Sequence, residues 1–239
     1  MQVGAYSSEI SKVLLALDPT LRALRSAVRK GAQLLLTHHP LIFKPISRLE
    51  ANSYPGDVII EAVKNGVSVV AAHTNLDVTQ GGMNDILARL LGLEQVEVLG
   101  EVDQAMGAGL GRIGYLAQPT ELSTLVVDVK AILGSGDLKV VGPGLDMVHR
   151  IALVAGSGGG MVSLAAGKGA DLLLTGDVSH HHALEAESLG IALIDGGHFC
   201  TENKAFKAFA DSLRDMVEGH GWEVAVEVDE DETDPMRLK

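Results

Sequence analysis

The sequence predicts an α/β fold made of two related α/β lobes, and two observations lead to this prediction. The first is an internal repeat: residues 13–39 align without a gap to residues 151–177, and 9 of the 27 positions are identical. The second is that both copies read as strand, turn, helix and strand, which is the pattern of a βαβ unit. We therefore expect two lobes around a pseudo-twofold axis, with a metal site between them at the carboxyl ends of their strands.

The elements of the first copy follow from local patterns. The apolar run 13–17 predicts a strand, and the helix after it is expected to end at Gly31, because glycine is the common residue just past a helix end. Residues 34–36 predict a second strand, and Gly66 opens a third that leads to His73. Asn84 is expected to be the N-cap of the next helix.

The second copy has the same order of elements. An apolar run at 151–155 is followed by a glycine-rich turn, a helix that should end at Gly169, and a buried strand at 172–174. Gly190 then opens a strand that leads to His198. We expect an N-terminal lobe at 1–93, a connecting segment at 94–149 that extends a sheet without forming an inserted domain, and a C-terminal lobe at 150–239.

Composition excludes several classes of function. The 239-residue chain has a formal net charge of −12 and only 3% aromatic residues, which argues against nucleic-acid binding. No apolar run approaches the roughly 20 residues of a membrane helix, and the first residues do not form a signal peptide. We therefore expect a cytoplasmic protein. Its single cysteine, Cys200, excludes an internal disulfide and four-thiolate metal sites.

Histidines mark the chemistry, because seven of the nine lie next to an expected strand end. His38 and His39 follow an apolar strand and precede a proline. His73 and His198 are each followed four residues later by a carboxylate, Asp77 and Glu202 respectively. The alternative is that these histidines are unrelated structural residues, but this does not explain why so many of them lie at strand ends.

These residue types favour a pair of divalent metal ions. Imidazoles with carboxylates suit Zn, Fe, Mn, Co or Ni, and two ions about 3.5–4 Å apart can bind and activate a water molecule. His38, His39, His198, Asp77 and Glu202 are the candidate ligands. His73 and His181 compete with them as ligands, or act as orienting or proton-transfer groups.

Two glycine-rich stretches suggest phosphate binding. Residues 109–114 match G-x-G-x-x-G, but no helix follows, so a dinucleotide site is not expected. The second stretch lies between a strand and a helix and can either bind an anion through backbone amides or form a tight turn; it comprises Gly156, Ser157, Gly158, Gly159 and Gly160.

Four motifs together resemble one known family. LLLTHHPLIFK, AAHTNLD with GGMND, LLTGDVSHHHALEA and GGHFCTE are similar to motifs of the GTP cyclohydrolase I type 2 homologues, also called Ngg-interacting-factor-three-like proteins. The resemblance runs from about residue 1 to residue 235. It implies a two-lobed α/β fold and a toroidal homohexamer, and it places two metal ions on His38, His39, Asp77, His198 and Glu202.

The resemblance also implies a function. We expect a metal-dependent hydrolase that uses a metal-activated water on a small molecule, with GTP as the substrate class that the family name gives. A non-catalytic protein that handles metal or regulates a partner is the alternative. Family members begin with a helix and a turn before the segment that resembles residues 1–4, so we expect the present sequence to lack that first helix.

Overall fold

The computed structural model describes residues 1–103, 108–142 and 146–236, and the chain divides into two compact units. The first unit comprises Met1–Leu76 and Phe206–Lys239, and the second comprises Asp77–Ala205. Within the described residues, no helix is both long and apolar enough to cross a membrane. The α/β fold predicted from the sequence is confirmed.

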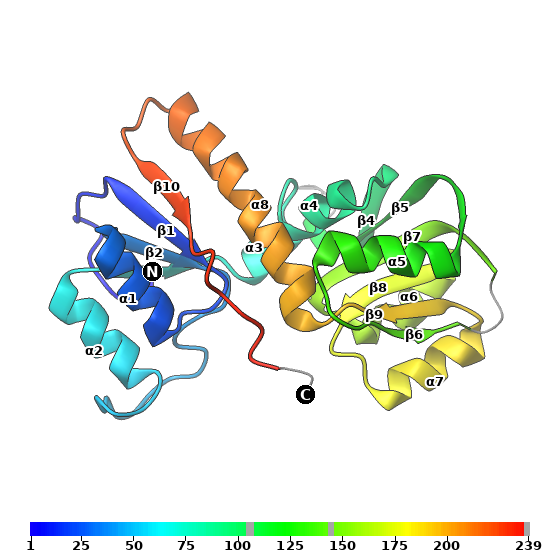
Figure 1. Ribbon diagram of the computed structural model, residues 1–239, viewed down its shortest axis with the longest axis horizontal. Helices are drawn as coiled ribbons and strands as arrows, with labels where there is room; N and C mark the ends of the chain where they lie inside the picture. Colours follow the sequence, from blue (N-terminus) through cyan, green and yellow to red (C-terminus); the bar gives the residue numbers. More distant parts are fainter. Residues whose placement is uncertain (104–107, 143–145, 237–239) are drawn as a thin grey trace. The chain divides into compact units, whose positions relative to one another are not determined.

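The first unit contains a sheet of four parallel strands in the order β10-β1-β2-β3 (Figure 1). Helices α1 and α2 lie side by side in the first unit. The strands are β1 (Lys12–Ala16), β2 (Leu34–Thr37), β3 (Ser68–Ala71) and β10 (Ala225–Val228), and the helices are α1 (Leu21–Lys30) and α2 (Gly56–Asn65).

Helix α1 shows why this sequence folds locally as it does. The Thr20 side chain accepts a hydrogen bond from the Ala23 amide and caps the first turn. Gly31 ends the helix in the left-handed conformation, with φ of 68°. Between these two ends, Leu24 and Ala27 are fully buried in the core of the unit.

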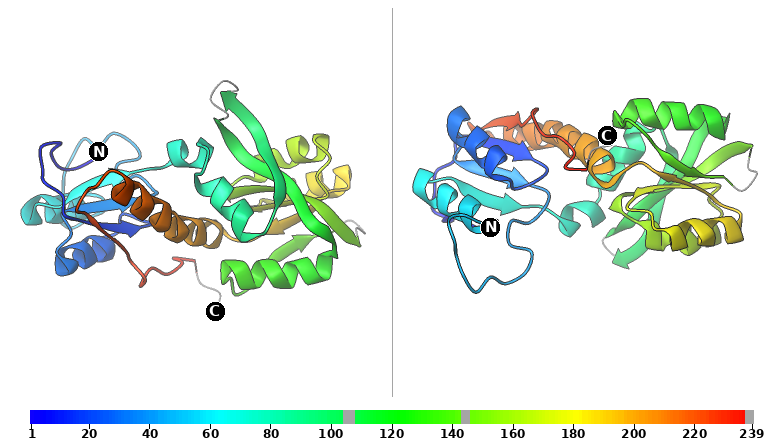
Figure 2. Two further views of the ribbon diagram at one scale, coloured as in Figure 1. Left: turned by 90° about the horizontal axis from the view of Figure 1, so that it is seen from above. Right: turned by 60° about the horizontal axis from the view of Figure 1, so that its bottom comes forward.

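The second unit is built on a sheet of six strands in the order β4-β5-β7-β8-β9-β6. Strands β7, β8 and β9 are parallel, whereas β4, β5 and β6 pair antiparallel with their neighbours, and β4 and β5 form a long pair (Figure 2). The strands are β4 (Glu94–Asp103), β5 (Ala108–Glu121), β6 (Lys139–Val141), β7 (Met147–Ser157), β8 (Leu172–Gly176) and β9 (Ala192–Asp195).

Helices cover both faces of this second sheet. Helix α5 lies on one face and α7 on the other (Figures 1 and 2). The helices are α4 (Met83–Leu90), α5 (Leu122–Leu133), α6 (Val162–Gly167) and α7 (His180–Leu189), with a short 3₁₀ turn η1 (Gly159–Met161) before α6. Two further helices cross the division between the units in sequence: α3 (Thr74–Val78) and α8 (His198–Gly219).

The two copies of the sequence repeat pair their strands in the same register. Val13 pairs with Leu34 in the first unit, and the aligned residues Ile151 and Leu172 pair in the second. Common origin of the copies and their pseudo-twofold arrangement stay predictions, as do the domain boundaries at 93/94 and 149/150. The segment 94–149 supplies β4, β5, α5 and β6 to the second unit; its residues 104–107 and 143–145 lie outside the described residues.

One local prediction was wrong. Asn84 is not the N-cap of α4, because the helix begins after Gly82 and Asn84 lies inside its first turn. The Asn84 side chain is buried instead, and its amide donates to the Asp77 carbonyl at 2.9 Å and accepts from the Ala155 amide at 2.9 Å. The polar side chain therefore links α4 to α3 and to β7 rather than capping a helix.

A buried ion pair fixes α4 against the second sheet. The Arg112 side chain is 3% exposed; Nη2 donates to Asp85 Oδ2 at 2.9 Å, and Nη1 donates to the Gly109 and Gly111 carbonyls. We expect Asp85→Ala to lower the free energy of unfolding by about 2–4 kcal/mol, because it leaves a buried cation with neutral acceptors only. Chemical denaturation measures the loss. Asp137→Ala, which removes a carboxylate 3.7 Å from exposed Lys130, should change stability little, and equal losses would contradict the prediction.

Candidate metal centre

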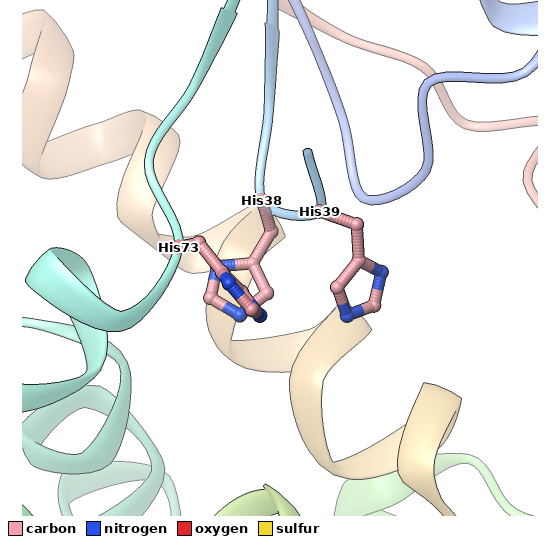
Figure 3. A group of neighbouring side chains, drawn as sticks. All are labelled: His38, His39 and His73. Carbon is pink, nitrogen blue, oxygen red and sulfur yellow. The ribbon is translucent and has the colours of Figure 1, made fainter. Parts of the chain in front are cut away.

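Three histidines of the first unit gather where its parallel strands end. His38 and His39 follow β2 directly, and His73 lies just after β3, so the sheet brings them to one edge. Figure 3 shows the three imidazole rings close together. Each offers a nitrogen, and these ligand atoms lie within 4.8 Å of one another. The group can therefore hold a metal ion.

His38 is held by the backbone. Its side chain is fully buried, and Nδ1 lies 2.8 Å from the Ala72 carbonyl oxygen. A carbonyl can only accept, so Nδ1 carries the proton and donates. In a neutral imidazole this assigns the lone pair to Nε2, which is the form that binds a metal ion.

His39 is held in the same way by a carboxylate. Its Nδ1 lies 2.8 Å from Asp18 Oδ1, and Asp18 follows the end of the neighbouring strand β1. The loop that carries Asp18 is itself fixed, because the carboxylate of Glu232 accepts from the Leu17 and Asp18 amides at 2.7 and 3.1 Å. Burial is the largest of the causes that raise the pKa of Glu232.

The second unit contributes a histidine and a carboxylate from one helical turn. His198 and Glu202 are four residues apart at the start of α8, with Nε2 and Oε2 3.1 Å apart. Nδ1 of His198 lies 2.7 Å from Asp177 Oδ2. The hydrogen bond to Glu202 is the main cause that raises the pKa of His198 to about 9, and Asp177 adds to it. In the metal-free protein this ring is thus an imidazolium between two carboxylates.

The glycine-rich loop makes room for Glu202. Gly156 has φ of +68°, and a Cβ placed on it would lie 2.1 Å from Glu202 Oε1. Its amide donates to Thr201 Oγ1 at 3.0 Å, and its carbonyl accepts from Thr175 Oγ1 at 3.1 Å. The structure therefore explains Gly156 by the close approach of the carboxylate of Glu202, a residue that is 4% exposed.

Other predicted site residues have different surroundings. Asp77 is half-buried in α3, and Asn84 fixes its carbonyl. His181 is exposed near the start of α7, whereas His182 forms a capping box with Ser179. A Cβ on Gly159 would lie 2.1 Å from His182 Nδ1. Anion binding by Gly156, Ser157, Gly158, Gly159 and Gly160 stays a prediction.

Asp18 and Asp177 are the site residues that the sequence analysis missed. Asp177 directly follows the last residue of the parallel strand β8, and Asp18 lies two residues after the last residue of β1. At these positions the carboxylate reaches the ring of a histidine from a neighbouring segment. An acidic residue at a strand end was the available signal, but each aspartate is far in sequence from the histidine that it contacts.

Comparisons with known proteins agree with this architecture. The family model described as Duf34/NIF3 (NGG1p interacting factor 3) matches residues 1–235. The chain is 36% identical over 222 residues to a "GTP cyclohydrolase 1 type 2 homolog" of Lactococcus lactis, covering 92% of this chain and 84% of that protein. It is 34% identical over 227 residues to a "GTP cyclohydrolase 1 type 2" of Helicobacter pylori, covering 95% and 85%.

A solved structure has the same fold. A hypothetical protein of Staphylococcus aureus superposes with a TM-score of 0.93 at 29% sequence identity, and the match covers 99% of this chain and 90% of that one.

The Gly156 loop supports a first test of the site. We expect Gly156→Ala to lower the free energy of unfolding by about 2–4 kcal/mol and to weaken metal binding, because the added methyl group displaces the Glu202 carboxylate and the backbone has positive φ. Thermal denaturation and metal titration measure the two effects. Gly160→Ala is the matched control, since within the described residues a Cβ there would meet no atom within 4 Å apart from its own chain neighbours. Equal behaviour of the two variants would contradict this explanation.

The raised pKa of His198 makes stability depend on pH in the metal-free protein. A raised pKa means that the folded state favours the proton, so the stabilisation is full below pH 6.5 and is lost as the pH rises through about 9. We expect the free energy of unfolding of wild type to exceed that of His198→Gln by about 1–2 kcal/mol at acid pH, after allowance for the partial exposure of the ring. This difference should vanish as the pH rises through about 9. Urea unfolding with chelator present, at pH 6 to 10, measures it. His220→Gln, at an exposed ring that contacts the Met216 carbonyl, is the control. A pH-independent difference would refute the expectation.

Proposed function

Since the chain belongs to the Duf34/NIF3 family and carries imidazole and carboxylate groups suited to metal, we propose that it is a metal-dependent hydrolase with two divalent metal ions per chain. The proposed ions are of the Zn, Fe, Mn, Co or Ni class. We assign as their ligands the five residues expected from the sequence: His38, His39, Asp77, His198 and Glu202.

The chemistry of the donors supports this proposal. The Nδ1 atoms of His38 and His39 are each engaged by an acceptor, which leaves Nε2 as the ligand atom. Imidazole nitrogens with carboxylate oxygens form a donor set of borderline hardness, the set that zinc and its neighbours prefer over calcium or magnesium.

The pair formed by His198 and Glu202 supports it independently. Glu202 is nearly buried, and in the metal-free protein the proton shared with His198 Nε2 compensates its charge. A metal ligand must be deprotonated, so His198 and Glu202 would hold a divalent cation in place of that proton, and the cation would supply the positive charge that the buried carboxylate requires.

When bound, two such ions supply Lewis acidity and lower the pKa of a water molecule. His73 is the residue that we assign to proton transfer, because its ring centroid lies 5.2 Å from that of His38 and 5.6 Å from that of His39. His181, which is exposed, is the second candidate for this role.

The substrate that we propose is a small molecule of the nucleotide class, in line with the printed name of the Helicobacter pylori relative. A protein with net charge −12 repels a polyphosphate at a distance, so the metal ions and the amides of the 156–160 loop would have to attract it. The proposal includes a homohexamer, which the family resemblance implies.

Metal content is the first test of this function. We expect elemental analysis, after dialysis against a mild chelator, to find close to two ions per wild-type chain and far fewer in His38→Ala, because the variant lacks a buried ligand. His220→Ala is the matched histidine control and should keep the wild-type content. Retention of metal by His38→Ala would contradict the assignment of this ligand.

Turnover then separates the two functions that these ligands can serve. Metal-loaded wild type is assayed on GTP and on a panel of nucleotides and phosphoesters, with Asp77→Ala as the inactive control. Hydrolysis above that control supports the enzyme. If the protein holds its full metal content but turns over none of these substrates, the hydrolase proposal is replaced by the alternative, a metal-handling or regulatory binding protein.

A further inference from the structure

We propose that Asp18 and Asp177 are positioning residues, each of which holds one ligand histidine in the tautomer and orientation that metal binding requires. The inference rests on the proposed metal centre and deepens it. Asp18 acts on His39 in the first unit, and Asp177 acts on His198 in the second. Neither aspartate is itself assigned as a ligand.

Asp18 is placed by a rigid surrounding. It follows the buried end of β1, and its amide and that of Leu17 both donate to the carboxylate of Glu232. The Asp18 carbonyl accepts from the Thr20 amide at 2.8 Å, which closes the loop before α1. With its backbone fixed on both sides, the Asp18 side chain can hold the His39 ring without further ordering of the loop.

Asp177 is placed by an unusual backbone conformation. Its φ is +55°, in the left-handed region that residues other than glycine seldom adopt. Asn and Asp tolerate this region better than other residues, and such conformations persist where the surrounding structure imposes them. The conformation directly follows β8, and Asp177 Oδ2 lies 2.7 Å from His198 Nδ1.

The repeat alignment makes the two contacts independent of each other. Asp177 aligns with His39, and Gly156 aligns with Asp18. In the first copy, His39 follows the second strand, β2, and Asp18 follows the first strand, β1. In the second copy, Asp177 follows the second strand, β8, and His198 comes from helix α8. The same pair, Nδ1 with an aspartate, thus arises from different positions, so the contact is not a by-product of strand pairing.

The chemistry explains what such a contact does. A carboxylate that accepts from Nδ1 fixes the tautomer, limits rotation of the ring and makes Nε2 a better electron donor to a metal ion. Loss of such a partner typically weakens metal affinity by about 10–100-fold. A role in folding alone predicts no change in the electronic environment of the bound metal.

Cobalt binding tests the inference, because Co²⁺ reports both affinity and ligand geometry through its visible absorption. We expect Asp18→Ala and Asp177→Ala each to weaken Co²⁺ binding by about 10–100-fold and to change the absorption spectrum. Asp18→Asn and Asp177→Asn keep an acceptor oxygen, and asparagine also suits positive φ, so they should lie between wild type and the alanine variants, several-fold weaker than wild type.

Two carboxylate deletions serve as matched controls. Glu61→Ala in the first unit and Asp137→Ala in the second remove the same charge from ion pairs that are 3.9 and 3.7 Å long, and both should keep wild-type affinity and spectrum. The inference is overturned if the Ala and Asn variants bind Co²⁺ as wild type does while His39→Ala fails to bind. If an Ala variant does not fold, an Asn variant with wild-type affinity and spectrum overturns it equally. Wild-type binding by His39→Ala would instead remove the proposed metal centre.

Discussion

Parallel pairing of β1, β2 and β3 is the constraint on which the histidine cluster of the first unit depends. Their register, with Leu34 between Val13 and Ser68, makes the three strands end at one edge. The residues that follow are Asp18, His38 with His39, and His73, one group for each strand. The side chains therefore meet although the chain separates them by up to 55 positions, from 18 to 73. The apolar strands supply the rigidity, and the loops that follow supply the chemistry.

Much of the fold, and the histidines at the ends of β2 and β3, could be predicted from sequence because the signals were local. Apolar runs and terminal glycines such as Gly31 marked the elements, and His-x-x-x-carboxylate pairs marked candidate ligands. Asp18 and Asp177 could not be found this way, since their roles depend on contacts with His39 and His198, each 21 positions away. Asn84 was misread for the same reason: its local context fits an N-cap, but its side chain bonds to Ala155, 71 residues distant.

The candidate ligand histidines of both units are held by hydrogen-bond acceptors at Nδ1. In the second unit, Asp177 and Glu202 flank His198 and hold it protonated, so one positive charge offsets two carboxylates in the metal-free protein. In the first unit the rings of His38 and His39 are each tied by Nδ1, one to a carbonyl and one to Asp18. Both units thus present nitrogen donors whose second ring atom is already committed, which lowers the ordering cost of binding a cation.

The discontinuity of the first unit has a consequence for synthesis of the chain. The second unit is one continuous segment that ends at Ala205, so it can fold while the ribosome still holds the rest. The first unit must wait, because β1 lacks its partner β10 and the Leu17 amide lacks Glu232, a contact that spans 215 residues. Until then β1 is an unpaired edge rich in leucine, the kind of strand that attracts other chains. The segment that holds β10 and Glu232 is made after β1, so it covers this edge late in synthesis and at the same time completes the loop beside His39.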